Sequence, residues 1–260
     1  MADSTSKAGG KYEKTFVKDP SCVSYSNADG FVKFHKVSGK LYMELSDRAI
    51  GKRMLIALTV TAVSDPEVLP VGYKPTKPLY VRFERPDSLV INLCEITLLP
   101  DYDKTDSALS AAVRRTTLDT VLETFPLYCE SPEGDAAVFD VTSFFGGGNE
   151  KLGPVKSGTS NYISTKFSLK KASDLVTGVK VFEDNAAVTS SHTYTINSDV
   201  LGLVSLKKDE PFTVTTTRTI LMLPDDIMAS RKADSRIGIF LTDRRLLRDG
   251  EEIDKYSVIN

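Results

Sequence analysis

The sequence has little of what metal and redox chemistry require. It contains two histidines, three cysteines and no tryptophan in 260 residues. His35 and His192 stand in separate strand-like segments and form no His-Glu-x-x-His motif, so zincin-type hydrolysis is not expected within this chain. Cys22, Cys94 and Cys129 are odd in number and lack Cys-x-x-Cys spacing, which argues against a disulfide framework and against a zinc site. Both histidines are therefore predicted to be structural or surface residues.

An excess of charge of one sign and a long hydrophobic run are also absent. The 33 basic and 35 acidic residues leave a net charge of −2, which gives no overall field to attract nucleic acid. The densest basic stretch, Arg244, Arg245 and Arg248, is bracketed by Asp243 and Asp249, which predicts the solvated surface of a hairpin. No apolar run approaches the ~20 residues needed to cross a bilayer. Neither nucleic acid nor a membrane span is expected.

The length and the N-terminus set the domain organisation. At roughly 150 residues per domain, 260 residues predict one large or two small domains. Residues 1–28 are polar and predict a flexible lead-in that attaches near Phe16 and Val17. The segment Met1–Lys7 has no apolar core for a signal peptide. Two alternatives follow: a cytoplasmic protein, or a chain whose targeting segment was removed and replaced by a start methionine.

Period-two patterns and turn residues predict antiparallel hairpins through most of the chain. In the segment from Leu41 to Leu45, apolar side chains alternate with Tyr42 and Glu44, which predicts a half-buried strand. The predicted hairpins join Phe31–Val37 to Lys40–Leu45, Leu79–Arg85 to Ser88–Leu98, Val121–Glu130 to Ala136–Val141, and Val179–Glu183 to Val188–Ile196. A further strand is predicted over Phe212–Leu223, where threonines supply β-branched side chains.

Helical signals are few. Asp106 is placed to cap a helix carrying Leu109 and Val113, and further short helices are predicted over Lys171–Thr177 and Asp225–Lys232. Consecutive hairpins with so few helices predict a mainly β, antiparallel, sandwich-like fold of packed sheets.

Three consecutive glycines suggest a boundary within this fold. Gly146, Gly147 and Gly148 follow an apolar stretch and remove side-chain restraint from the backbone. We therefore expect a β-rich subdomain over residues 29–146 and a second over residues 147–260.

No motif assigns a site. A Gly-x-Ser-x-Gly elbow is missing, although a serine-hydrolase triad can be dispersed through a sequence. The glycines after Phe145 lack the Gly-Lys-Ser/Thr ending of a phosphate loop. Asp101, Asp103 and Asp106 could attract calcium, but their spacing fails as an EF-hand and favours a solvated acidic loop. Cys94 lies in an apolar run and is predicted to be a buried thiol. Catalytic, cofactor-binding and metal-binding residues are each predicted to be none.

Several segments, taken in order, resemble a known family. They are Gly30–Lys36 (GFVKFHK), Lys40–Leu45 (KLYMEL), Ile50–Leu55 (IGKRML), Val81–Arg85 (VRFER), Phe139–Phe145 (FDVTSFF) and Asp234–Phe240 (DSRIGIF). Across residues 12–260 their order resembles the N-terminal region of the met-zincin-like zinc-dependent metallopeptidases of Bacteroides-group bacteria. The ordered set, and not any single segment, carries the resemblance.

The resemblance implies a non-catalytic role for this chain. In that family the corresponding region consists of domains of unknown function, and the zinc-binding helix lies downstream of the segment resembling Tyr256–Asn260. Zinc is therefore implied in a C-terminal peptidase domain of the same polypeptide, whereas no cofactor is implied here. The family is normally exported, which implies a periplasmic, cell-surface or secreted location.

Two functions from different classes remain open. The first is an accessory module that packs on the peptidase domain, shapes or covers its cleft and contacts peptide or protein substrates through strand edges. The second is a freestanding β-sandwich that binds protein or glycan. Glycan platforms rely on aromatic faces, and a chain without tryptophan would have to use tyrosines. An unrecognised hydrolase is a third and weaker alternative.

Overall fold

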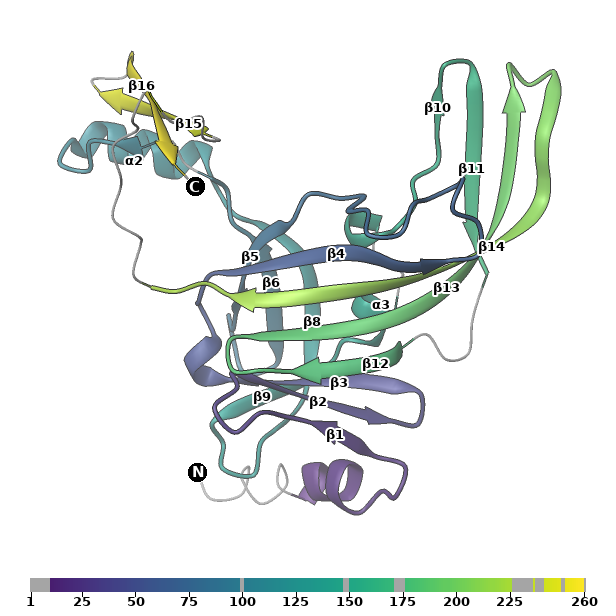
Figure 1. Cartoon of the computed structure of the whole chain (residues 1–260). Coiled ribbons are helices and arrows are strands. Elements are labelled where there is room, and N and C mark those ends of the chain that lie inside the picture. The colour runs from purple at the N-terminus through teal and green to yellow at the C-terminus, as the bar shows by residue number, and fades with distance from the viewer. Residues whose placement is uncertain are drawn as a thin grey trace.

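A computed structural model describes residues 10–98, 101–146, 150–170, 176–225, 236, 241–248 and 251–259. In these residues one antiparallel sheet dominates (Figure 1). Its strands are β1 (Val23–Tyr25), β2 (Val32–Val37), β3 (Lys40–Ser46), β4 (Met54–Val63), β5 (Leu79–Glu84), β6 (Val90–Glu95), β8 (Thr120–Glu130), β9 (Ala136–Asp140), β10 (Gly158–Ser160), β11 (Ile163–Leu169), β12 (Val176–Val181), β13 (Asn185–Val200) and β14 (Val204–Met222). The mainly β prediction is confirmed.

The large sheet curls back on itself. Its strand order is β1-β2-β3-β9-β8-β6-β5-β4-β14-β13-β11-β10, and β12 pairs with β13. The curl brings β12 close to β1 and β2, where the Lys36 ammonium donates to the Val176 carbonyl at 2.8 Å. A Cβ atom on Gly30 would lie 3.1 Å from the Phe182 carbonyl oxygen, so the backbones approach closely at this closure. The two halves of the sheet therefore face each other across one core, as in a sandwich.

The core is apolar and lies inside the curl. Aromatic rings from several strands meet there, for example Phe83, Phe125 and Phe139, whose neighbouring ring centroids are 5.2–5.9 Å apart. The helix α3 (Thr142–Phe145) adds Phe144 and Phe145, both buried, and the short helical turn η3 (Glu150–Leu152) adds Leu152. Burial of these side chains supplies the main stabilisation of the fold.

Local sequence signals place the hairpins correctly. β2 pairs with β3, β5 with β6, β8 with β9, and β12 with β13, all antiparallel as predicted. The first turn contains Ser38 (φ 50°) and Gly39 (φ 74°), and glycine adopts such a conformation without strain. β14 covers the predicted strand Phe212–Leu223 but begins earlier, at Val204. Its outward threonines pair with those of β13; the hydroxyl oxygens of Thr189 and Thr217, for example, are 2.9 Å apart.

The prediction that β3 is half-buried was wrong. Tyr42 and Glu44, expected on a solvent face, are only 6% and 2% exposed. The helical segment η1 (Glu13–Val17) covers that face and places Phe16 against the Tyr42 ring at 5.3 Å. Phe16 is buried, whereas Val17 is exposed. Both faces of β3 are therefore buried, because part of the predicted lead-in packs on the outside of the sheet.

The helix predicted after Asp106 is confirmed as α2 (Ser107–Thr116), and the Asp106 carboxylate accepts hydrogen bonds from the backbone of Ala108 and Leu109. A three-residue turn, η2 (Asp47–Ala49), follows β3. The predicted helix over Lys171–Thr177 lies mostly outside the described residues, and its last two residues belong to β12. The predicted helix over Asp225–Lys232 lies outside them except for its first residue. No helix in the described part of the chain is long and apolar enough to cross a bilayer.

The predicted boundary after Gly146 borders residues outside the described ranges, and the subdomain division stays a prediction. Strands from both sides of it share one sheet, since β4 pairs with β14.

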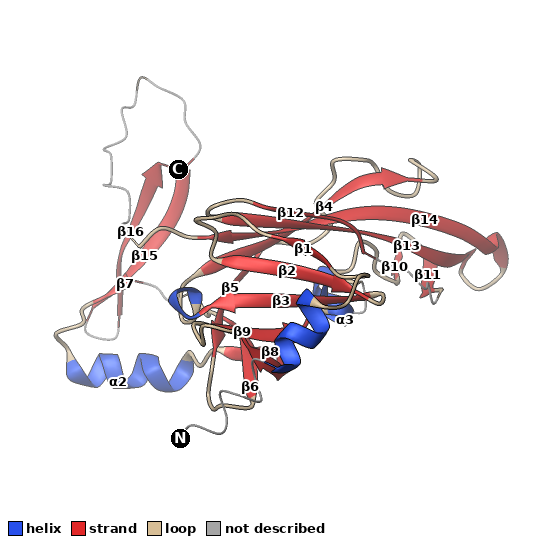
Figure 2. Cartoon of the chain, turned by 90° about the horizontal axis from the view of Figure 1, so that it is seen from below, coloured by secondary structure: helices blue, strands red, loops and turns tan. Residues whose placement is uncertain are grey.

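Two units project from the curled sheet. We call the first the arm: it consists of residues 158–169 and 194–211, the β10–β11 hairpin together with the distal halves of β13 and β14. The arm stands beyond the main core in Figures 1 and 2. The second is a small sheet of β7 (Asp101–Tyr102), β15 (Leu241–Arg248) and β16 (Glu251–Ile259), which lies near α2. The hairpin predicted around Arg244 is confirmed as β15–β16.

Candidate functional site

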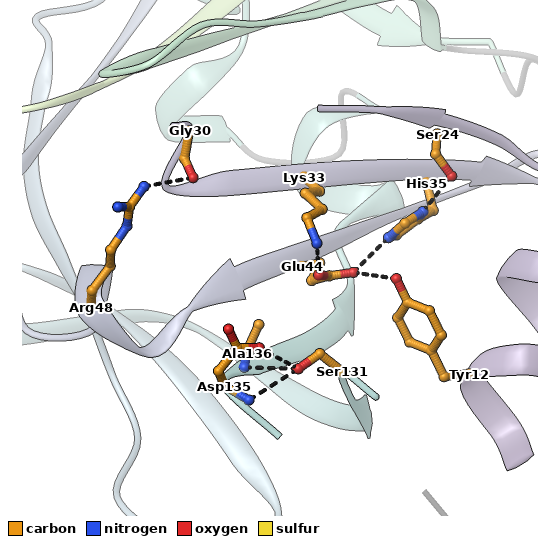
Figure 3. A network of polar contacts seen from close by, with 10 residues as sticks. All are labelled: Tyr12, Ser24, Gly30, Lys33, His35, Glu44, Arg48, Ser131, Asp135 and Ala136. Carbon is orange, nitrogen blue, oxygen red and sulfur yellow. Dashed lines mark hydrogen bonds and ion pairs between the residues drawn. The ribbon is translucent and has the colours of Figure 1, made fainter. Parts of the chain in front are cut away.

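The Glu44 carboxylate is the centre of a buried polar network between η1, β2 and β3 (Figure 3). It accepts hydrogen bonds from the Tyr12 hydroxyl at 2.7 Å, the Lys33 ammonium at 2.8 Å and His35 Nε2 at 2.9 Å. His35 Nδ1 lies 2.7 Å from the hydroxyl of Ser24, which is exposed on β1. The carboxylate is thus held by Tyr12, which immediately precedes η1, and by two donors from β2, and His35 extends the network to the surface.

The network keeps Glu44 ionised. Burial alone would raise the pKa of its carboxyl, but the hydrogen bonds from His35, Lys33 and Tyr12 outweigh burial and lower it to about 2. The same contacts also shift the pKa values of two of the donors. Burial, followed by the Glu44 hydrogen bond, raises the pKa of Tyr12, and the hydrogen bond raises the pKa of Lys33. At neutral pH Glu44 is therefore an anion paired with a lysine cation.

Ser24, His35 and Glu44 follow the order of a serine-hydrolase relay. Ionised Glu44 accepts from His35 Nε2, and in the tautomer that carries its proton there, Nδ1 accepts from the Ser24 hydroxyl. In the serine-protease template the two ring nitrogens have the opposite partners. Here Glu44 also accepts from Lys33 and Tyr12, so its charge is shared among three donors and is not directed at His35 alone. This arrangement favours a structural role over an activated nucleophile. We call the set of Tyr12, Ser24, Lys33, His35 and Glu44 the Glu44 clamp.

Aromatic contacts attach the N-terminal segment over this clamp. The Phe16 ring stacks on His35 with centroids 4.6 Å apart, and Tyr12 meets His35 edge-on at 5.8 Å. The Lys11 ammonium lies 3.8 Å from the centre of the Tyr128 ring. These contacts exclude water from His35, which is 3% exposed.

A second buried polar cluster surrounds Arg218, the largest fully buried side chain among the described residues. Its two terminal nitrogens donate to the carbonyls of Phe145 and Leu152, each at 2.9 Å, and one of them also donates to Ser190 Oγ at 2.6 Å. Within the described residues no carboxylate pairs with Arg218. The guanidinium therefore ties the ends of α3 and η3 to the inner face of β14.

His192 lies beside this cation. Ser190 Oγ accepts from Arg218 and donates to His192 Nε2, 2.9 Å away, so the ring proton is assigned to Nδ1. Burial and then the Arg218 charge lower the pKa of His192 to about 4. The ring is neutral at pH 7. His192 Nδ1 and Arg218 Nε have no hydrogen-bond partner in the described part of the chain.

The remaining candidates have structural explanations. Cys94 is buried, as predicted, and burial raises the pKa of its thiol and that of Cys129 to about 11. In the acidic loop, Asp103 accepts from Thr105, and Asp106 caps α2. In the described ranges no three His, Cys, Asp or Glu side chains form a metal-binding group.

Exposed apolar side chains gather at the end of the arm. We call this set the arm tip, and each residue's exposed fraction follows its name: Tyr162 73%, Ile163 39%, Leu201 64%, Leu203 84%, Val204 58% and Leu206 51%. The residues lie in or beside two neighbouring turns, which are linked by a hydrogen bond from the Leu201 N–H to the Tyr162 carbonyl at 3.0 Å. Several large apolar side chains exposed near one another are a feature of interaction sites.

The sequence patterns did not predict the Glu44 clamp, the Arg218 cluster or the arm tip. Glu44 was predicted to face solvent, and Arg218 was not singled out within Phe212–Leu223, because charged residues are rarely buried without a partner. One available signal was Leu201-Gly202-Leu203, a turn-like glycine flanked by leucines where polar residues are usual.

Comparison with known proteins identifies a family but no characterised relative. The family described as "Domain of unknown function (DUF5117)" matches residues 74–257. No curated protein and no solved structure matches the chain significantly. The matched region contains the arm and Arg218, whereas the residues of the Glu44 clamp precede it. Since the match spans more than half of the sequence, the chain belongs to the DUF5117 family of domains of unknown function.

Proposed function

We propose that this chain is a non-catalytic accessory module that docks on a zinc-dependent peptidase domain of the same polypeptide. The resemblance described above supplies the identity of the partner, and the same resemblance supports export to the periplasm or cell surface. In this proposal zinc and the catalytic residues belong to the peptidase domain, and this chain shapes or covers its cleft.

The arm is the observation that carries the proposal. The main core is closed by the curled sheet and filled with side chains, whereas the arm extends beyond it and ends in exposed apolar residues. A second, smaller core at the arm's base supports it; Tyr194, Ile196 and Phe212 are buried there. A supported projection with an apolar end is suited to contact another protein domain.

The arm also offers a free strand edge. β10 pairs with β11 on one side and, among the described strands, has no neighbour on the other. All three of its residues are exposed. An extended peptide could add to this edge by backbone hydrogen bonding, which supports a role in contacting peptide or protein substrates.

Binding to the separately produced peptidase domain tests the proposal. We expect a stoichiometric complex by size-exclusion chromatography with light scattering, and a changed rate of casein hydrolysis when the module is added. Absence of a complex at high micromolar concentration, with unchanged hydrolysis, would refute the accessory role.

The alternative function, a freestanding protein- or glycan-binding module, predicts a different result. Such a module would bind glycan arrays or unrelated proteins without affecting the peptidase. Among the described tyrosines, Tyr162 and Tyr73 are the exposed candidates for sugar stacking.

A further inference from the structure

Two neighbouring hairpin turns of the arm hold large apolar residues in the left-handed conformation. In the turn from Val200 to Leu203, Leu201 has φ 53° and Gly202 has φ 70°, and the Val200 carbonyl accepts from the Leu203 N–H at 2.9 Å. In the β10–β11 turn the corresponding residues are Asn161 (φ 49°) and Tyr162 (φ 68°). Both turns show the sign pattern of type I′, in which both central residues have positive φ.

These residues are unfavourable choices for such turns. Asparagine followed by glycine suits a type I′ turn, whereas leucine and tyrosine are strained at positive φ. Packing within this chain does not offset the strain, because Leu201 is 64% and Tyr162 is 73% exposed. Strained residues that no internal contact explains are characteristic of functional positions. The turns thus present apolar side chains at the expense of local stability.

The shape of the arm tip restricts what can bind it. The two linked turns form the narrow, convex end of a projecting pair of hairpins (Figure 1), whereas a stable flat interface needs roughly 800 Å² from each partner. A convex apolar end buries enough surface for stable binding only when the partner surrounds it, as a protein pocket or a lipid bilayer does. Partners of these two kinds differ in how they accommodate charge.

The charges around the arm tip favour a protein pocket. Immediately behind the turn, the Asp199 carboxylate accepts from the Gly202 N–H at 2.7 Å, and hydrocarbon would penalise an ionised group so close to the inserted residues. Further back, Lys207 is paired with Asp65 at 3.1 Å and Glu210 at 3.2 Å. Counted over the arm, Lys166, Lys207 and Lys208 are balanced by Asp199, Asp209 and Glu210, and an arm without net positive charge offers little attraction to an anionic lipid surface. A protein pocket can place hydrogen-bond donors opposite Asp199.

We infer that the arm tip inserts into an apolar pocket on the partner domain, with hydrogen-bond donors at the pocket rim facing Asp199. This inference rests on the proposed function and specifies which surface of the module makes the contact. Tyr162, Leu201 and Leu203 are the most exposed members of the arm tip and act as its anchors.

A double variant, Leu201→Asn with Leu203→Ser, separates docking from folding. Asparagine before Gly202 relieves the strain, so the melting temperature should be unchanged or higher. Affinity for the separately produced peptidase domain, measured by calorimetry, should fall by about thirtyfold or more, the effect of removing a binding hot spot. Leu118→Ser is the matched control, because Leu118 is 74% exposed and lies outside the arm; it should bind like the wild type.

The outcomes distinguish this inference from the proposed function. Failure of the wild type to bind the peptidase domain would overturn the accessory role and, with it, the docking surface. Equal binding by the wild type and the double variant would overturn the docking surface alone. The docking surface is also wrong if vesicles of phosphatidylcholine and phosphatidylglycerol retain the wild type but not the double variant, which would identify lipid as the partner. Concentration-dependent dimerisation abolished by the double variant would identify a second copy of the chain instead.

Discussion

Acidification should destabilise the fold through His192, and the size of this effect follows from its burial. The pKa of this ring is lowered from 6.5 to about 4, first by burial and then by the neighbouring Arg218 charge. The unfolded chain therefore takes up a proton near pH 6.5, while the folded chain resists protonation until about pH 4. Stability is fully present above pH 6.5 and is lost as the pH falls towards 4.

The expected loss is large relative to the stability of a protein of this size. A difference of about 2.5 pKa units at about 1.4 kcal/mol per unit gives about 3 kcal/mol at pH 4, of which about 2 kcal/mol is already lost by pH 5. His192 is 1% exposed, so solvent screening does not reduce the effect appreciably. A loss of this size is a substantial part of the roughly 5–15 kcal/mol that stabilises a typical domain.

His192→Gln isolates the contribution of the ring. The glutamine amide oxygen can accept from Ser190 as Nε2 does, but it does not titrate in this range. Urea unfolding followed by circular dichroism at pH 7, 6, 5 and 4 gives the free energy of unfolding for both proteins. Carboxylates titrate in both proteins and cancel in the difference. Parallel pH profiles for wild type and variant would refute the reasoning and show that His192 is accessible to protons in the folded state.

Three further predictions concern the buried polar groups. Glu44→Gln should lower the free energy of unfolding by about 3 kcal/mol at pH 7, and this difference from the wild type should vanish as the pH falls from about 4.5 to 2, because the lowered pKa of Glu44 stabilises the fold only above that range. A difference that is the same at pH 7 and pH 2 would contradict this. Arg218→Lys should lower the free energy of unfolding in urea by roughly 1.5–3 kcal/mol, because an ammonium group cannot bridge the carbonyls of Phe145 and Leu152 as the guanidinium does. An unchanged urea midpoint would show that this bridge is dispensable. A fluorophosphonate probe should not label Ser24, because Lys33 also holds the carboxylate of the relay; labelling that disappears in Ser24→Ala would establish an active nucleophile.

The order of strands along the chain could be predicted because hairpins are local. Alternation of apolar side chains and turn residues such as Ser38-Gly39 act over a few neighbouring residues, and β2–β3 formed as predicted. The same holds for α2, whose start depends on the Asp106 carboxylate and the backbone N–H groups of Ala108 and Leu109. The sequence by itself thus determined the strand-rich class, the hairpin pairs and the longest described helix.

Only the tertiary structure decided which polar residues are buried. Glu44 has the pattern of an outward residue, and it became buried because η1, about thirty residues away, covers that face of β3. Arg218 alternates with outward threonines on β14, and the curl of the sheet together with α3 encloses it. The arm tip likewise depends on pairing between β11 and β13, which brings two turns from distant segments together. Period-two patterns report which side of a strand a residue occupies, whereas distant segments determine what covers that side.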